Sequence, residues 1–237
     1  MVDLEEEQRY EQLRKLGQEL HIPIPEAFWE LEVRDKHGRL IQRHRQRSHS
    51  WVRNAYNMMF SYLAMKDLDD TTFGAGKLSL KKTDGDVEYG DGPTCVNQQS
   101  TVDGTTSGYR AAGGVTNRGI IVGSGTTAES FEDYFLETMI DEGAGAGQLN
   151  YATSNPHVIT WTPATKTLKN ELVRYINNNS GGDVDVNEVG IAFNGTHVDS
   201  TTSARYMTSR DVLDTTVTVP DTGQLKVTYT IQLTYPE

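Results

Sequence analysis

The stretch "GIIVGSGTTAES", residues 119–130, contains the spacing of a dinucleotide-binding turn. Gly123, Gly125 and Ala128 spell G-x-G-x-x-A, in which the glycines let backbone amides approach a pyrophosphate at the N-terminus of a following helix. The residues after Ala128 allow at most about two or three helical turns before "GAGAG", and Asp141, placed like a ribose-binding acid, falls in a polar loop. We therefore predict no nucleotide cofactor. We expect a structural turn whose glycines supply backbone angles that a Cβ makes costly.

Alternating acids raise the possibility of a calcium site. Two series occur: Asp84, Asp86 and Glu88, and Asp183, Asp185, Asn187 and Glu188. The first series has Tyr89 where an EF-hand needs its invariant glycine. The second lies in a predicted strand, where alternate acids share one solvent face. We interpret both as solvated acids and predict no metal site, with a single surface calcium ion as the alternative.

The histidines do not show the spacing of a metal or catalytic motif. Three lie in one basic segment, and three are isolated in sequence: His37, His44 and His49, and His21, His157 and His197. H-E-x-x-H, G-x-S-x-G and the phosphate-binding P-loop are absent from the sequence. We predict that the chain is not an enzyme and name no catalytic residue. A Ser-His-Asp site assembled in space stays open as an alternative.

Residues 34–53 form a basic segment in an acidic chain. The net charge of the chain is −11, and this segment has seven cations against Asp35 alone, which gives +6 and leaves −17 elsewhere. The predicted assembly surface consists of these cations and one tryptophan: Arg34, Lys36, Arg39, Arg43, Arg45, Arg47, Arg53 and Trp51. Arginines near Trp29, Trp51 and Tyr56 also suit nucleic acid. Because the arginines alternate along a strand in an acidic protein, we favour a protein interface that pairs them with carboxylates.

The elements that would position this segment form an N-terminal arm. Residues 3–20 predict an amphipathic helix with acids in its first turn and a thin stripe of Leu4, Leu13, Leu16 and Leu20, which suits a partner better than a core. Residues 28–34 and 39–47 predict a hairpin around a loop at 35–38, with bulky residues on one side and arginines on the other. A second helix of about four turns follows, capped by Ser48 or Ser50.

The remaining residues predict β-structure. Residues 77–82 and 86–89 suggest short strands around a turn at 83–85. Seven further runs are separated by turn residues: 119–125, 147–152, 157–163, 168–180, 184–195, 215–223 and 224–236. This pattern predicts a mainly β protein with an antiparallel, jelly-roll-like β-sandwich. The last run alternates strictly from Leu225 to Leu233, so we expect it to be central.

Composition limits the class of protein. The 237 residues suffice for one large domain or a core with an appendage, and we divide them into a docking arm at 1–66 and a sandwich at 67–237. The acidic N-terminus lacks the features of a secretory signal, and no apolar run approaches the roughly 18 residues of a membrane span. Cys95 is the single cysteine, which excludes an intrachain disulfide.

Three stretches together resemble a known group of proteins. They are "LEVRDKHGRLIQRHRQRSHSWVRNAYNMMF", "IIVGSGTTAESFEDYFLETMI", and "NNNSGGDVDVNEVGIAFNG" leading to "SRDVLDTTVTVPDTGQLKVTYTIQLTYP". They are similar to poorly characterised structural proteins of tailed bacteriophages, in which a V-G-x-G-T-T turn precedes a tyrosine-containing loop and an R-D-V-L step feeds a terminal strand. The resemblance covers roughly residues 30–237 and brings no active-site residues. It implies a virion component of the tail, collar, fibre or head-associated kind that assembles into a symmetric oligomer.

The sequence thus predicts a phage structural protein made in the host cytoplasm and located in the virion. Its expected partners are copies of itself and other virion proteins, without nucleic acid or membrane, and with a glycan as a further possibility. The rival hypothesis is a carbohydrate-binding or host-adhesion module that stacks sugars on exposed aromatic residues such as Tyr89, Tyr109, Tyr134 or Trp161. An enzyme of unrecognised type is the third.

Overall fold

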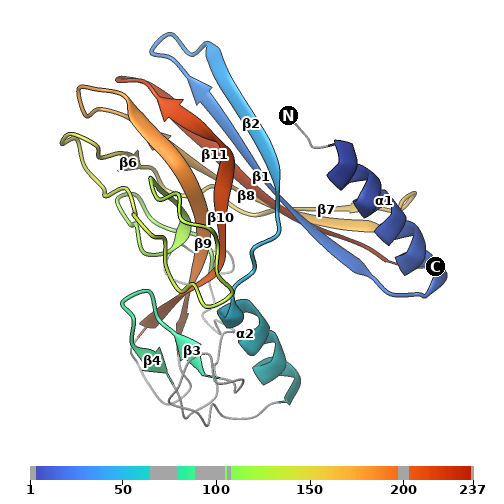
Figure 1. Cartoon of the computed structure of the whole chain (residues 1–237). Coiled ribbons are helices and arrows are strands. Elements are labelled where there is room, and N and C mark those ends of the chain that lie inside the picture. Colours follow the sequence, from blue (N-terminus) through green and yellow to red (C-terminus); the bar gives the residue numbers. More distant parts are fainter. Residues whose placement is uncertain (1–3, 65–78, 89–104, 106–107, 197–202, 236–237) are drawn as a thin grey trace.

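The computed structural model describes residues 4–64, 79–88, 105, 108–196 and 203–235, and it confirms a mainly β, antiparallel protein with two helices (Figure 1). The helices are α1 (Leu4–Glu19) and α2 (Arg53–Ala64). The strands are β1 (Ile24–Arg34), β2 (Leu40–Ser48), β3 (Leu80–Lys81), β4 (Val87–Glu88), β5 (Gly119–Gly123), β6 (Asn150–Tyr151), β7 (Val158–Thr162), β8 (Thr167–Asn177), β9 (Val184–Thr196), β10 (Ser203–Val219) and β11 (Gln224–Thr234).

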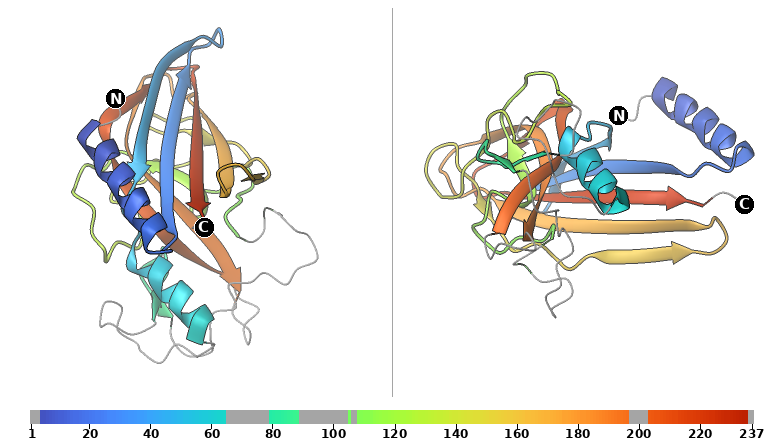
Figure 2. Two further views of the ribbon diagram at one scale, coloured as in Figure 1. Left: turned by 90° about the vertical axis from the view of Figure 1, so that its right-hand side faces the viewer. Right: turned by 90° about the horizontal axis from the view of Figure 1, so that it is seen from below.

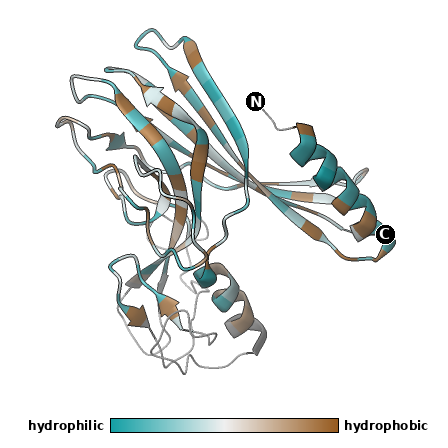
Figure 3. Ribbon diagram, in the orientation of Figure 1, coloured by the Kyte–Doolittle hydropathy of each residue, from teal (hydrophilic) through white to brown (hydrophobic). Residues whose placement is uncertain are grey.

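The larger sheet has six strands in the order β2-β1-β11-β8-β6, with β7 also paired to β8. Strand β11 pairs with β1 on one side and with β8 on the other along its whole length. The expectation that the last run is central is therefore confirmed. Its alternation places Leu225, Val227 and Tyr229 in the core and threonines on the outer face (Figure 3).

The smaller sheet, β10-β9-β5, faces the larger one and closes the sandwich core. Apolar side chains from both sheets meet there in one cluster, including Trp29 and Leu31 from β1 and Val186 and Val189 from β9. These four side chains are fully buried. Burial of a large apolar side chain contributes roughly 1.5 to 3 kcal/mol, so this cluster is a main source of stability.

Two glutamines of β2 join the sheets along one side. The side-chain amide of Gln42 donates to the carbonyl of Thr216 and accepts from the amide of Thr218, while Gln46 donates to the carbonyl of Val212 and accepts from the amide of Asp214. The pairing of β10 with β9 shifts register between Val212 and Val217. Side chains thus satisfy backbone groups of β10 where its ladder is irregular.

The predicted hairpin forms, with Gly38 at a φ of 77° in its loop. Strand β1 is hydrogen-bonded to β11, so residues 24–48 are part of the sandwich rather than an appended arm. The predicted boundary after residue 66 therefore does not separate the hairpin from the sandwich. The first helix agrees closely with its predicted range.

The predicted caps of the second helix are wrong. Helix α2 begins at Arg53, and Ser48 ends β2, where its hydroxyl group donates to Asp211. The turn at 83–85 forms between β3 and β4, with Gly85 at a φ of 95°. Parts of the strands predicted at 77–82 and 86–89, residues 77, 78 and 89, lie outside the described residues.

Candidate assembly surface

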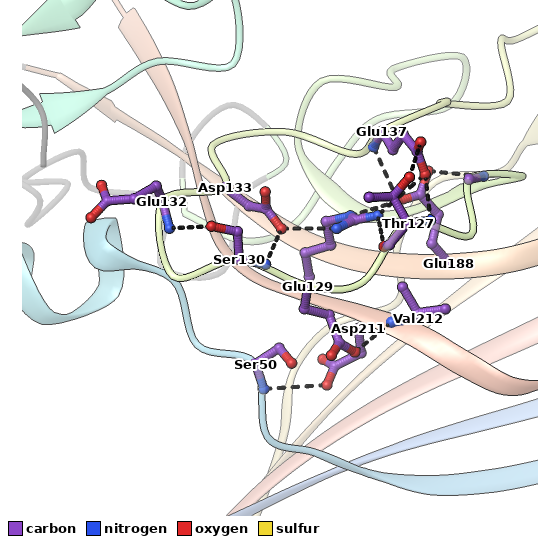
Figure 4. A network of polar contacts seen from close by, with 12 residues as sticks. Ser50, Thr127, Glu129, Ser130, Glu132, Asp133, Glu137, Glu188, Asp211 and Val212 are labelled. Atoms are coloured by element: carbon purple, nitrogen blue, oxygen red, sulfur yellow. Dashed lines mark hydrogen bonds and ion pairs between the residues drawn. The ribbon is translucent and has the colours of Figure 1, made fainter.

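The glycine turn after β5 wraps around a buried carboxylate (Figure 4). Glu188, from β9, has no exposed side-chain surface and accepts hydrogen bonds from the amides of Gly125, Glu137 and Thr138. A Cβ on Gly125 would lie 2.6 Å from a Glu188 oxygen. Gly123 and Gly125 do not have positive φ angles, so the predicted reason for these glycines is wrong: they give room for the carboxylate. Residues 124–157 contain no helix, so the strand-turn-helix unit of the dinucleotide fingerprint does not form.

Arg210 neutralises Glu188 in the interior. Its Nε donates to Glu188 at 2.7 Å, its Nη1 to Asp133 at 2.8 Å and its Nη2 to the carbonyl of Thr127 at 3.0 Å. Arg210 is only 2% exposed. The pair therefore fastens the loop at 124–138 onto β9 and β10, a structural role for the V-G-x-G-T-T segment.

A second buried carboxylate, Asp211 of β10, lies beside His49 and Ser50, which begin the connection from β2 to α2. One oxygen accepts from Trp29 Nε1, Ser48 Oγ and Ser209 Oγ at 2.7 to 2.8 Å. The other accepts from the backbone amide and the Nδ1 of His49, and from the amide of Ser50. The hydrogen bond to Asp211 raises the pKa of His49 to about 9. Burial raises the pKa of Asp211, but its hydrogen bonds outweigh this and leave the pKa below its ordinary value.

This cluster has the composition of a Ser-His-Asp site without its geometry. Ser48 and His49 both bind Asp211, whereas a nucleophilic serine must hydrogen-bond to the histidine. Ligand atoms of His49, Glu129 and Asp211 lie within 4.8 Å of one another. However, both Asp211 oxygens are occupied by hydrogen-bond donors, and Glu129 accepts from the amide of Val212. The geometry favours a structural ion pair over a metal ligand set.

Most residues of the predicted assembly surface have partners within the same chain. Arg39 pairs with Asp35, Arg43 with Glu30 and Arg53 with Glu132, while Arg34 donates to the carbonyl of Gly38. Arg45 lies over the ring of Phe28, and Lys36 is exposed in the hairpin loop. Trp51 is partly buried and donates to the hydroxyl of Tyr229.

Arg47 is not a surface residue. It is 5% exposed, and its guanidinium group binds Glu26 and Glu7 and lies over the ring of Tyr10. Arg14 of α1 binds the same two glutamates. This network of two arginines and two glutamates holds α1 on the outer face of the sheet. Most cations of the +6 segment therefore pair with carboxylates of the same chain: Arg39, Arg43, Arg47 and Arg53.

The larger sheet continues beyond the smaller one, and Figure 1 and the right-hand view of Figure 2 show this end projecting with α1 beside it. We call it the sheet extension: residues 24–27 of β1, 231–234 of β11, 167–171 of β8, and β7. Directly paired residues share a face of a sheet. The registers therefore place Leu233, Leu168 and Trp161 on the face that forms the core further along. No described strand of the smaller sheet pairs with or packs as a layer on this face. Apart from Ala27, which lies at its inner end and is buried, its side chains are partly or largely exposed.

The uncovered face leads into an apolar cavity of about 260 Å³ where the extension meets α2 and the smaller sheet. Its lining includes Met58 and Met59 of α2, Ile231 of β11 and Tyr229 of the core. The outermost residues are more exposed: Ile159 is 67% and Trp161 48% exposed. On the other side of the sheet, Leu4, Leu13 and Leu16 of α1 and Leu20 directly after it are exposed. The predicted leucine stripe therefore has no full covering within the described chain.

The aromatic residues predicted to stack on sugars do not share one environment. Tyr109 packs on Phe193, Tyr134 lies under Lys81, and Trp161 contacts Tyr235 with ring centroids 5.5 Å apart. Tyr89 lies outside the described residues. Trp161 and Tyr235 are both exposed, at 48% and 43%.

Comparisons with known proteins identify no relative: no family model, curated protein or solved structure matches the chain. Among the described residues, neither helix combines the length and the apolar character that a membrane crossing requires.

Proposed function

We propose that the chain is a structural subunit of a tailed-bacteriophage virion, in a tail, collar, fibre or head-associated assembly, and that it acts through oligomerisation and protein–protein contacts. The observation that carries this proposal is the sheet extension, whose apolar face and leucine-bearing helix remain exposed in the single chain. Exposed apolar surface of this kind is typical of interaction sites. The three sequence stretches that resemble phage structural proteins supply the virion context. The proposal needs no catalytic residue, metal or cofactor.

Electron microscopy of purified particles labelled with an antibody to this chain tests the proposal. We expect the label at one regular position, as for a subunit present in a fixed number of copies. Particles from an infection in which the gene is disrupted serve as the control and should carry no label. Intact, infectious particles that lack the chain in both preparations would contradict the virion assignment.

A carbohydrate-binding role is the second candidate, and the exposed Trp161–Tyr235 pair favours it. Aromatic rings at the surface can stack on sugar rings, and titration with glycans would quench tryptophan fluorescence if Trp161 were the platform. Replacing Trp161 by phenylalanine, with Trp29 and Trp51 retained, separates the Trp161 signal from that of the other two tryptophans. Size-exclusion chromatography with light scattering then distinguishes a monomeric lectin from an assembling subunit.

A further inference from the structure

The two edges of the larger sheet differ in how they are protected against pairing with another chain. Strand β2, at one edge, has Arg43 and Arg45 exposed on its outer face, and charged side chains discourage pairing. Strand β7, at the other edge, reads Val-Ile-Thr-Trp-Thr and contains no charge, proline or glycine. All five residues of β7 are exposed, and its only described pairing is with β8. Such an edge is suited to accept another strand.

The hydrogen-bond pattern shows which groups β7 presents. The amide of Tyr235 donates to the carbonyl of Lys166, which makes Thr167 and Thr234 a non-hydrogen-bonded pair between β8 and β11. The backbone groups of Thr167 therefore point to β7, where Thr162 is the paired residue. Because these groups alternate along an antiparallel strand, the N–H and C=O groups of Ile159 and Trp161 point away from the sheet.

We propose that β7 pairs antiparallel with β7 of a second copy of this chain, centred on Thr160. In this register Ile159 of each copy faces Trp161 of the other, and both pairs use the outward backbone groups. Val158 faces Thr162, so the strand has no charged or mismatched pair against itself. This inference rests on the proposed function, since it names the partner and the surface for its oligomerisation.

The faces of the two sheets support a second copy as the partner. Ile159 and Trp161 lie on the same face as Leu168 and Leu233, so pairing would join the uncovered apolar faces of two extensions into one surface. Cross-strand contacts between aromatic and β-branched side chains stabilise antiparallel pairs. The joint is closed by a two-fold axis and leaves α1 and the smaller sheet free for other partners.

Cysteine cross-linking tests both the partner and the register. In a Cys95→Ser background, Thr160→Cys places two thiols opposite each other at a non-hydrogen-bonded pair, where Cα atoms lie about 4.5 Å apart and a disulfide can form. Val158→Cys is the matched control, because its two copies would be about 13 Å apart along the paired strands. We expect a covalent dimer from Thr160→Cys, none from Val158→Cys alone, and a dimer when Val158→Cys is mixed with Thr162→Cys.

Ile159→Pro tests the backbone contribution, because it removes an outward N–H without removing a bond to β8. We expect dimerisation to weaken by about tenfold or more in sedimentation experiments, with an unchanged circular dichroism spectrum, whereas Ile159→Val should associate like the natural chain. Equal cross-linking of Thr160→Cys and Val158→Cys, or no cross-linking of Thr160→Cys, overturns the inference. Should the uncross-linked chain still label particles, the proposed function survives and β7 has another partner, such as a different virion protein or a glycan.

Discussion

Two tryptophans on one face of the larger sheet have opposite surroundings. The strand registers place Trp29 and Trp161 on the same face, yet Trp29 is fully buried with its Nε1 bonded to Asp211, whereas Trp161 is 48% exposed. The difference arises because the smaller sheet covers the first position and no described strand covers the second. Alternation in the sequence thus identifies the apolar face but not the length over which another layer of this chain covers it.

The sandwich body and the sheet extension also differ in how they treat polar groups. The body encloses Glu188, Arg210, Asp211 and Arg174, each 2% exposed or less and each held by several hydrogen bonds. Arg174 donates to five backbone carbonyls and lies over the ring of Tyr151, and burial lowers its pKa to about 10. Such networks fix one arrangement of loops. The extension differs from the body, because no described layer of this chain packs on its apolar face.

Breaking the Glu188–Arg210 pair should give the largest loss of stability. Glu188→Gln removes the charge of one of the carboxylates that bind the buried Arg210. Removal of one partner of a buried ion pair costs about 3 to 5 kcal/mol. Chemical denaturation measures the free energy of unfolding. Lys226→Met, which breaks a partly exposed pair with Glu32 on the outer face, should cost less than about 1 kcal/mol.

The double variant Glu188→Gln with Arg210→Met completes a thermodynamic cycle. A strong coupling between the two changes is expected, since they share one network. Additive losses would show that the loop at 124–138 is held by its other contacts and that the body does not depend on this pair.

Gly125→Ala tests whether the turn requires a glycine at this position because a side chain does not fit. The new Cβ would lie within 2.6 to 2.7 Å of Glu137 and Glu188 atoms, and overpacking costs typically 1 to 3 kcal/mol. Gly182→Ala is the control, because Gly182 has no neighbour within 4 Å and no positive φ. Thermal unfolding should show a large decrease in melting temperature for the first variant and almost none for the second.

The same experiment can address the dinucleotide spacing. A nucleotide that binds the folded state at a hundred times its dissociation constant adds about 2.7 kcal/mol of stability. We expect NAD and ATP to leave the melting temperature of the natural chain unchanged. An increase that Gly125→Ala abolishes would restore the nucleotide hypothesis.

The sequence predicts the strands well wherever one face is apolar, and less well where charges are buried. Strand β11 is found at its predicted place because Leu225 to Leu233 alternate, and β10 is predicted only from residue 215 although it begins at Ser203. The missed part contains Arg210 and Asp211, which are typical of exposed segments. Their partners, such as Glu188 and Trp29, are distant in sequence, so nothing local indicates that they are buried.

The sequence indicates that the chain has a surface for partners, but it does not locate the sheet extension. The leucine stripe of α1 is exposed as the pattern indicates, but the arginines chosen for assembly find their carboxylates mainly within the chain. The uncharged run 158–162 has the composition of an ordinary strand. Only the pairing of strands shows that it is an edge without a layer over its apolar face.

The His49–Asp211 pair should make stability depend on pH above neutrality. The pKa of His49 is raised from 6.5 to about 9 in the folded chain, so its stabilising contribution is complete below pH 6.5 and disappears as the pH rises through 9. Asp211 stays ionised over this range, because its pKa is below the ordinary 3.8. We expect the difference in unfolding free energy between the natural chain and His49→Gln to shrink from about pH 6 to about pH 9.5. A constant difference would mean that the imidazole and the carboxylate are not coupled.

Trp161→Ala should have only a small effect on folding, although the same substitution at Trp29 should cost about 3 to 5 kcal/mol. Trp161 loses mainly its contact with Tyr235, and an exposed aromatic pair is worth roughly 0.5 to 1.5 kcal/mol. Thermal unfolding of the two variants at low protein concentration compares the monomers directly. At high concentration, Trp161→Ala should also weaken association, because the side chain lies on the face that a second copy would extend. A loss of stability at Trp161 equal to that at Trp29 would show that a layer of the same chain already covers the extension, and the contrast between body and extension would then be wrong.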